Sequence, residues 1–325
     1  MLSFAGVVLG VTLLIVGGGL LVRGASEIAA GFGISPMIIG LTVVGFGTSS
    51  PELVVNVVGA INGTTDIAFG NVIGSNISNL GLVLGAAAMF STIRIQGTLV
   101  RREIPLLLLA TTMTMVMALD GPLEGQPAAI GRTDALILAL TFFIFVYIIA
   151  LDIIRVRQED VLLDEIGGES AVLGPTKSRY CWFMVVGGFV LLMLGGEFTV
   201  RNGVALATQI GVSEAVVGLF VVAVGTSMPE LVTSIIAAMR KEADLALGNV
   251  IGSNLFNSLM VLPTSGAIAQ LPVPKGGVGD LVVSWLLAAA LIPLFFYGRA
   301  MLGRISGGAF LLVYFGYAIY RFVNT

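Results

Sequence analysis

Two stretches of this sequence, 178 residues apart, match each other without a gap. Residues 40–79 and residues 218–257 are identical at 22 of 40 positions, which is far more than chance gives. The glycine pairs 17–18 and 195–196 match at the same interval. An internal repeat of this kind predicts that the chain consists of two structurally related halves.

Long apolar segments give the class of protein. They run for 18–25 residues, the length that crosses a hydrocarbon core of ~30 Å as an α-helix. Only 11% of the residues are charged, whereas a soluble domain has about 25%. We therefore predict an all-α integral membrane protein with ten transmembrane helices. The expected spans are 4–22, 36–60, 66–91, 103–119, 132–151, 181–200, 213–239, 243–269, 280–298 and 305–323.

These spans divide into two five-helix repeats, 1–151 and 181–325, joined by a polar linker at 152–180. Because five is odd, the second repeat must enter the membrane with the opposite orientation. With both termini outside and the linker cytoplasmic, the cytoplasmic loops hold 12 of the 16 Lys and Arg residues, as the positive-inside rule requires. Inverted repeats are typical of secondary transporters of the cell (inner) membrane, with the substrate site between the repeats.

The first repeated block is GTSSPE at 47–52, which recurs as GTSMPE at 225–230. A proline in a helix leaves the carbonyl four residues earlier without its usual donor, so Pro51 frees the carbonyl of Gly47. Free carbonyls at membrane depth persist where they line a cavity or bind something. Thr48, Ser49 and Glu52 can share one helix face, which predicts a cluster of oxygen ligands around a carboxylate in each half.

The second repeated block is GNVIGSNISN at 70–79, which recurs as GNVIGSNLFN at 248–257. Asn71, Ser75 and Asn79 are spaced by four, so they form one polar stripe on an otherwise apolar helix. The glycines of the block let a neighbouring helix approach closely.

The residue types available in these blocks favour a small, hard cation. A charged side chain in the middle of a membrane span costs at least ~2.5–3.5 kcal/mol on insertion scales, and here a glutamate occurs there in each half. Calcium takes 6–8 oxygen ligands, and two glutamates neutralise one Ca²⁺. The same oxygens can be divided among Na⁺ ions, and competition for shared carboxylates is a physical basis for antiport.

The paired blocks resemble the two α-repeats of the calcium/cation antiporter superfamily, specifically its prokaryotic sodium/calcium exchanger branch. The resemblance covers essentially the whole chain and implies Ca²⁺/Na⁺ exchange, with the first and sixth helices sliding past the rest. It implies that the ion ligands are Glu52 and Glu230, shared at the midplane, together with Gly47, Thr48, Ser49, Gly225, Thr226, Ser227, Ser75, Asn79, Ser253 and Asn257. Several superfamily members have an aspartate at one of the positions of Asn79 and Asn257, so this pocket has two negative charges rather than three.

Three other functions compete with exchange of Ca²⁺ for Na⁺. A Ca²⁺/H⁺ antiporter is the alternative, because glutamate alone can carry protons. An intramembrane serine protease needs a histidine, which the chain lacks, and an intramembrane aspartyl protease needs two aspartates where the helix interiors offer only glutamate, so an enzyme is disfavoured. A passive channel usually needs a symmetric oligomer. We expect a monomer in the lipid bilayer that binds the transported Ca²⁺ and Na⁺, with no cofactor and no nucleic-acid partner.

Two acidic residues are expected to have a structural role. Glu27 lies four residues after Arg23, and Glu197 lies four residues before Arg201. This spacing predicts an ion pair on the surface of one helix in each case.

Overall fold

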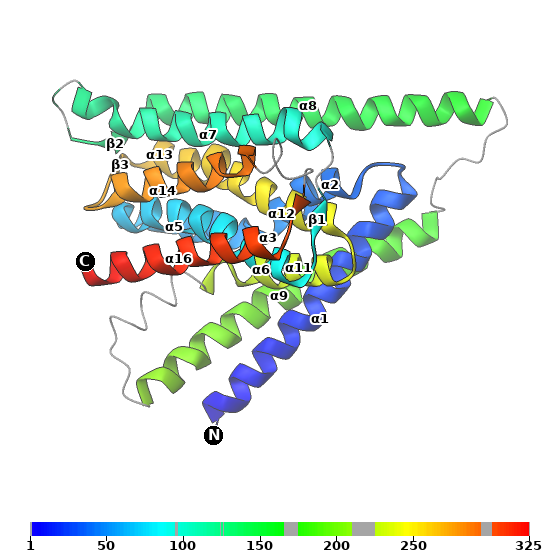
Figure 1. The fold of residues 1–325 in the computed structure, drawn as a ribbon, viewed down its shortest axis with the longest axis horizontal. Helices are drawn as coiled ribbons and strands as arrows, with labels where there is room; N and C mark the ends of the chain where they lie inside the picture. Colours follow the sequence, from blue (N-terminus) through cyan, green and yellow to red (C-terminus); the bar gives the residue numbers. More distant parts are fainter. Residues whose placement is uncertain are drawn as a thin grey trace.

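The fold is a bundle of helices, shown in the computed structural model of Figure 1. The structure describes residues 2–94, 97–123, 125, 127–165, 175–209, 225–293 and 301–324. The α-helices are α1 Leu2–Gly31, α2 Pro36–Ile39, α3 Gly45–Thr48, α4 Ser50–Ile61, α5 Thr65–Ser78, α6 Leu84–Phe90, α7 Gly97–Leu123, α8 Arg132–Glu165, α9 Pro175–Gln209, α11 Met228–Met239, α12 Ala243–Phe256, α13 Leu262–Ile268, α14 Gly277–Ala289 and α16 Arg304–Asn324. Three π-helical segments, η1 Gly40–Val44, η2 Asn79–Val83 and η3 Asn257–Val261, continue the helices before them.

Within the described residues, seven helices are long and apolar enough to cross a membrane, and the bent pair Pro36–Thr48 and Ser50–Ile61 gives an eighth span. This confirms an all-helical membrane protein. The predicted spans 213–239 and 280–298 lie partly outside the described residues, and their described parts are the shorter apolar helices Met228–Met239 and Gly277–Pro293. The total of ten spans therefore stays a prediction. So does the division at 152–180, into which α8 and α9 extend.

The two helices that carry the GNVIGSN blocks form the centre of the bundle. In an 18-residue window of the spans Ala68–Phe90 and Ala243–Ile268, 83% and 94% is buried, whereas the corresponding shares for Arg132–Arg155 and Arg304–Val323 are 22% and 17%. Each central span is an α-helix followed by a π segment and a second α-helix. Packing on all sides explains why these helices carry apolar residues around most of their circumference.

Helices α1 and α9 lie side by side, diagonally to the rest of the bundle (Figure 1). Glycines form the seam between them. A Cβ atom on Gly17 would lie 2.9 Å from the Gly188 carbonyl oxygen, and a Cβ on Gly195 would lie 2.7 Å from the Leu14 backbone nitrogen. Because there is no room for side chains at these positions, the two backbones pack in direct contact.

Two short antiparallel ladders close the ends of the bundle. Strand β1 (Ile93–Arg94) pairs with β4 (Met301–Leu302), and β2 (Ala129–Ile130) pairs with β3 (Leu271–Pro272). β1 and β3 are related by the repeat interval of 178 residues. The loops paired by each ladder are the ones that the positive-inside rule assigns to the same side of the membrane.

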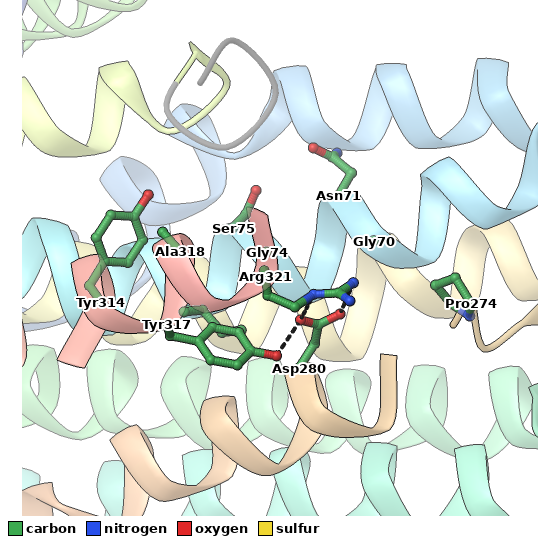
Figure 2. A pocket seen from close by; sticks show the side chains of 11 residues that line it. Gly70, Asn71, Gly74, Ser75, Pro274, Asp280, Tyr314, Tyr317, Ala318 and Arg321 are labelled. Carbon is green, nitrogen blue, oxygen red and sulfur yellow. Dashed lines mark hydrogen bonds and ion pairs between the residues drawn. The ribbon is translucent and has the colours of Figure 1, made fainter. Parts of the chain in front are cut away.

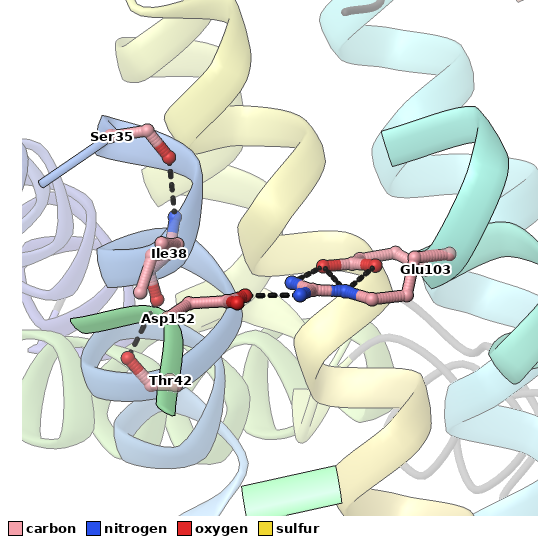
Figure 3. A network of polar contacts seen from close by, with 6 residues as sticks. Ser35, Ile38, Thr42, Glu103 and Asp152 are labelled. Atoms are coloured by element: carbon pink, nitrogen blue, oxygen red, sulfur yellow. Dashed lines mark hydrogen bonds and ion pairs between the residues drawn. The ribbon is translucent and has the colours of Figure 1, made fainter. Parts of the chain in front are cut away.

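Figure 3 shows the polar contacts that tie α7 to α8. The Arg102 guanidinium contacts the carboxylates of Glu103 and Asp152, and its Nε donates to Glu103 Oε1 at 2.9 Å. The Glu103 side chain is buried, and an ionised carboxylate is stable in such a place only when it is paired. This ion pair holds the start of α7 against the end of the membrane-spanning part of α8.

Candidate functional site

The first GTS-x-PE block breaks the helix between α3 and α4, and the second block has the same turn immediately before α11. Ser49 leaves the helical region with φ −88° and ψ 6°, and Ser227 does the same with φ −86° and ψ 6°. The axes on either side of Ser49 differ by 42°. The predicted proline break is therefore present, and α4 and α11 each start with a glutamate in their first turn. The positive end of a helix dipole favours a carboxylate at that place.

The two glutamates are the buried charges of this site. Glu52 is 1% exposed and Glu230 is 0% exposed. Ser49 Oγ donates to Glu230 Oε1 at 2.9 Å. Within the described part of the chain, both oxygens of Glu52 and the second oxygen of Glu230 have no hydrogen-bond partner. Buried carboxylate oxygens without donors are costly, and a bound cation would satisfy them.

Asn79 and Asn257 also offer unused polar atoms. Both side chains are buried, and none of their amide atoms has a hydrogen-bond partner among the described residues. Each is the first residue of a π-helical segment, η2 or η3. A π segment widens the helix locally and often occurs at functional sites. The sequence blocks end at these asparagines, but the apolar residues that follow gave no signal of the π segments.

The remaining predicted residues form two unequal groups. In one, Thr48 Oγ1 donates to Asn249 Oδ1 at 3.1 Å and lies 3.4 Å from Ser253 Oγ, which donates to the Gly45 carbonyl at 3.2 Å. In the repeat-related group, Ser75 Oγ and Thr226 Oγ1 are 3.5 Å apart. The first group is therefore closed by hydrogen bonds between the two repeats, and the second group is looser.

Asn71 and Ser227 show the same difference in hydrogen bonding between the two repeat-related groups. The Asn71 Nδ2 atom has no partner in the described chain, whereas its repeat counterpart Asn249 donates to Ser234 Oγ at 2.9 Å. The Ser227 hydroxyl also has no partner there, although its counterpart Ser49 bonds to Glu230. Asn249 and Ser234 were missed as site residues. The sequence repeat does point to Asn249, because its block is identical to the block of Asn71 at eight of ten positions.

Two cavities reach the looser group. One, of about 450 Å³, is lined by Asn71, Thr226 and residues of α4 and α9. The other, of about 270 Å³, is lined by Asn71, Ser75 and residues of α14 and α16 (Figure 2). Among the described residues, two cavities thus reach the looser group, whereas hydrogen bonds between the two repeats hold the first group.

Gly47 and Gly225 have a packing role that the sequence did not predict. A Cβ on Gly47 would lie 2.0 Å from Phe189 Cζ on α9, and a Cβ on Gly225 would lie 2.9 Å from the Val200 side chain, also on α9. The glycines of the GTS-x-PE blocks thus allow α9 to pass directly over both helix breaks.

The two expected surface ion pairs have different outcomes. Arg23 Nε and Glu27 Oε1 are 2.8 Å apart, which confirms that pair. The expected pair between Glu197 and Arg201, both of which the structure describes, is wrong, because their charged groups are not within 4.0 Å. Glu197 instead lines the larger cavity. The spacing of four residues allows the two side chains to meet but does not require it. Here the Glu197 side chain lines a cavity beside the helix instead.

Comparison with known proteins gives one family. The sequence matches the family described as sodium/calcium exchanger protein over residues 2–151 and 180–323. The sodium/calcium exchanger MaX1 of Methanosarcina acetivorans is 29% identical over 356 residues, which cover 98% of each chain. The inner membrane protein YrbG of Escherichia coli is 33% identical over 296 residues, which cover 89% of this chain and 88% of YrbG.

The fold matches a solved structure of the same kind. The sodium-calcium exchanger NCX_Mj, soaked with 2.5 mM Na⁺ and 1 mM Sr²⁺, superposes with a TM-score of 0.82 and 28% sequence identity, covering 98% of this chain and 97% of that chain. The likeness therefore extends over nearly the full length of both proteins.

Proposed function

Because the chain belongs to the sodium/calcium exchanger family, we propose that it is a secondary antiporter that exchanges Ca²⁺ for Na⁺ by alternating access. Members of this family are transporters, so the chain is a multi-pass membrane transporter and not an enzyme. The observation that carries the proposal is the buried pair Glu52 and Glu230, three of whose four carboxylate oxygens have no hydrogen-bond partner in the described chain.

These oxygens suit ions of the sizes and charges proposed. Two carboxylates balance the charge of one Ca²⁺, and the surrounding hydroxyl and amide oxygens supply the further neutral ligands that Ca²⁺ needs. The ligand set that we propose is Gly47, Thr48, Ser49, Glu52, Ser75, Asn79, Gly225, Thr226, Ser227, Glu230, Ser253 and Asn257. Na⁺ ions compete for the same oxygens, so the two kinds of ion cannot occupy the shared carboxylates together.

The arrangement in the membrane follows from the repeat. We propose ten helices in two inverted repeats, with both termini outside the cell and the linker at 152–180 in the cytoplasm. YrbG is described as an inner membrane protein, which supports the same membrane for this chain.

With both termini outside, the two cavities at Asn71 open to the outside, while the Thr48, Asn249 and Ser253 contacts close the cytoplasmic side. A single chain holds both glutamates, which supports a functional monomer.

Exchange of Ca²⁺ for H⁺ is the second candidate. The Glu52 carboxylate accepts no hydrogen bond from the described residues, and a proton would neutralise it as a cation would. Both candidates use the same glutamates, so the ion gradient that drives Ca²⁺ uptake is the property that distinguishes them.

The test is ⁴⁵Ca²⁺ uptake into proteoliposomes that contain the purified protein and an outward Na⁺ gradient, with the pH clamped on both sides. We expect uptake that depends on the Na⁺ gradient and stops when the gradient is collapsed. Uptake that is independent of the Na⁺ gradient but depends on an imposed pH gradient would identify a Ca²⁺/H⁺ antiporter. Ca²⁺ flux with no counter-ion requirement would identify a channel.

A further inference from the structure

The larger cavity has walls that are mostly apolar. Pro51 and Val55 of α4 line one wall, and Met193 and Val200 of α9 line another. Thr226 brings a hydroxyl group of the proposed ion site into the same cavity, and Asn71, one turn before the proposed ligand Ser75, adds an amide group. Glu197 is the ionisable residue among the described residues that line it. A cleft with low-dielectric walls focuses the field of a charge, so one carboxylate can raise the local concentration of cations.

The Glu197 carboxylate can attract cations in this way. Its side chain is exposed, and within the described part of the chain it forms no ion pair and no hydrogen bond. Arg201, one turn further along α9, does not neutralise it by contact. The Glu197 carboxylate therefore belongs to the lining of the cavity and has no fixed positive charge in contact with it among the described residues.

The smaller cavity differs in this respect. Asp280 lines it, but Arg321 Nε lies 3.0 Å from Asp280 Oδ1, and the Tyr317 hydroxyl donates to the same oxygen at 2.6 Å (Figure 2). The positive charge of Arg321 lines that cavity as well. The Asp280 carboxylate is neutralised by the fixed positive charge of Arg321. The smaller cavity therefore attracts a mobile cation much less than the larger cavity does.

The repeat-related position also differs. Position 197 corresponds to Gly19 on α1 at the repeat interval of 178 residues. A Cβ atom on Gly19 would lie 3.4 Å from an Arg240 guanidinium nitrogen. The corresponding place in the other half thus has no carboxylate and has a cation beside it. The two halves are alike at the ion ligands and unlike in charge at these two positions.

We propose that Glu197 recruits cations into the larger cavity and so raises the apparent affinity for Ca²⁺ on one side of the membrane only. Glu197 acts on the arrival of the ion and is not one of the ligands in the central site. This inference rests on the proposed antiport and assigns the route by which the transported cation reaches Asn71 and Thr226 from the open side.

The test uses Na⁺-driven ⁴⁵Ca²⁺ exchange in right-side-out and inside-out membrane vesicles, titrated with Ca²⁺ at low ionic strength. In Glu197→Gln we expect the Ca²⁺ concentration for half-maximal exchange to rise about three- to tenfold with the maximal rate unchanged. The rise should occur in only one vesicle orientation and shrink when an inert salt raises the ionic strength. Glu197→Asp should restore most of the wild-type value, because it keeps the charge.

Glu242→Gln is the matched control. It removes the same charge next to Arg240 and Lys241, at the other end of the proposed pathway, and its side chain does not cap α12. We expect no change in half-saturation on the side that Glu197 affects. An unchanged half-saturation in Glu197→Gln, an equal change in both vesicle orientations, or a loss of maximal rate independent of salt would overturn the proposal. Failure of the antiport itself would appear separately, as wild-type protein without Na⁺-dependent uptake.

Discussion

At the scale of single residues, the two glutamates have the same place in the repeat but different surroundings. Glu230 accepts a hydrogen bond from Ser49, whereas the Ser227 hydroxyl, which matches Ser49, has no partner in the described chain. The same halves differ at the neighbouring threonines, because Thr48 is hydrogen-bonded to the other repeat, whereas Thr226 lines a cavity. A bound cation would give Glu52 the partner that the protein itself does not provide.

The first prediction concerns these carboxylates. Glu52→Gln and Glu230→Gln keep the size of the side chain and remove the charge that balances Ca²⁺. Each should abolish Na⁺-driven ⁴⁵Ca²⁺ uptake while the protein still elutes as a single species in detergent. Glu27→Gln, which removes a charge at the exposed pair with Arg23, should retain uptake. Full uptake by either site variant would refute the proposed role of that glutamate.

The second prediction concerns a strained turn between α11 and α12. Lys241 has φ 64°, and its repeat counterpart Gly63 has φ 77°. A residue with a Cβ atom pays about 1 kcal/mol in this left-handed region, whereas glycine does not. Lys241→Gly should therefore stabilise the folded protein by about 0.5–1 kcal/mol, seen as a higher unfolding temperature in detergent. Lys241→Ala removes the charge but keeps the Cβ, so an equal gain in that variant would contradict the explanation.

At the scale of elements, the contact between α1 and α9 depends on glycines at the seam. A Cβ on Gly188 would lie 2.7 Å from the Leu21 backbone nitrogen, but a Cβ on the adjacent Gly187 would meet nothing within 4 Å. The two positions differ only in the face of α9 that they occupy. They therefore separate the effect of close helix packing from the effect of glycine in a helix.

The third prediction follows from this pair of positions. Gly188→Ala should push α1 and α9 apart and destabilise the protein by about 1–3 kcal/mol, the usual cost of overpacking. Gly187→Ala should be neutral or slightly stabilising, because alanine favours a helix more than glycine does. Thermal unfolding in detergent measures both. Equal effects of the two variants would show that the seam does not depend on direct backbone contact.

At the scale of the whole molecule, the central feature is a repeat whose halves match in sequence but not in contacts. The hydrogen bonds of Thr48 with Asn249 and Ser253 close one half, and cavities of about 450 and about 270 Å³ open the other. In an inverted repeat, exchanging the two sets of contacts would open the site to the opposite side. This is the geometric requirement for alternating access around a fixed site.

The fourth prediction fixes the orientation of the molecule. The chain has one cysteine, Cys181, which is buried, so Cys181→Ser gives a background for labelling. In that background, Lys275→Cys should react with a membrane-impermeant maleimide from outside intact cells, because residue 275 lies in a predicted external loop. Arg304→Cys should react only after the cells are permeabilised. Both side chains are exposed, so the reverse pattern would mean that the proposed orientation is wrong.

Much of this protein follows from its sequence. The length and polarity of the apolar runs predicted membrane helices, because a bilayer admits only segments that satisfy their own backbone hydrogen bonds. The doubled GTS-x-PE blocks predicted broken helices with buried glutamates, because proline removes a backbone donor wherever it lies in a helix. Both properties are local to the chain, and the structure agrees with them.

The tertiary structure decided which side chains are left without partners. Asn249 donates to Ser234 in one half, whereas the Asn71 Nδ2 atom has no partner among the described residues, and Asn56, which matches Ser234, donates to the Glu52 carbonyl instead. Glu197 and Arg201 have the spacing of an ion pair, yet Glu197 lines a cavity instead. These outcomes depend on how α9 crosses the helix breaks and on which side of the site is closed. Sequence sets the chemical groups that are available, whereas packing between distant segments sets the direction in which each group points.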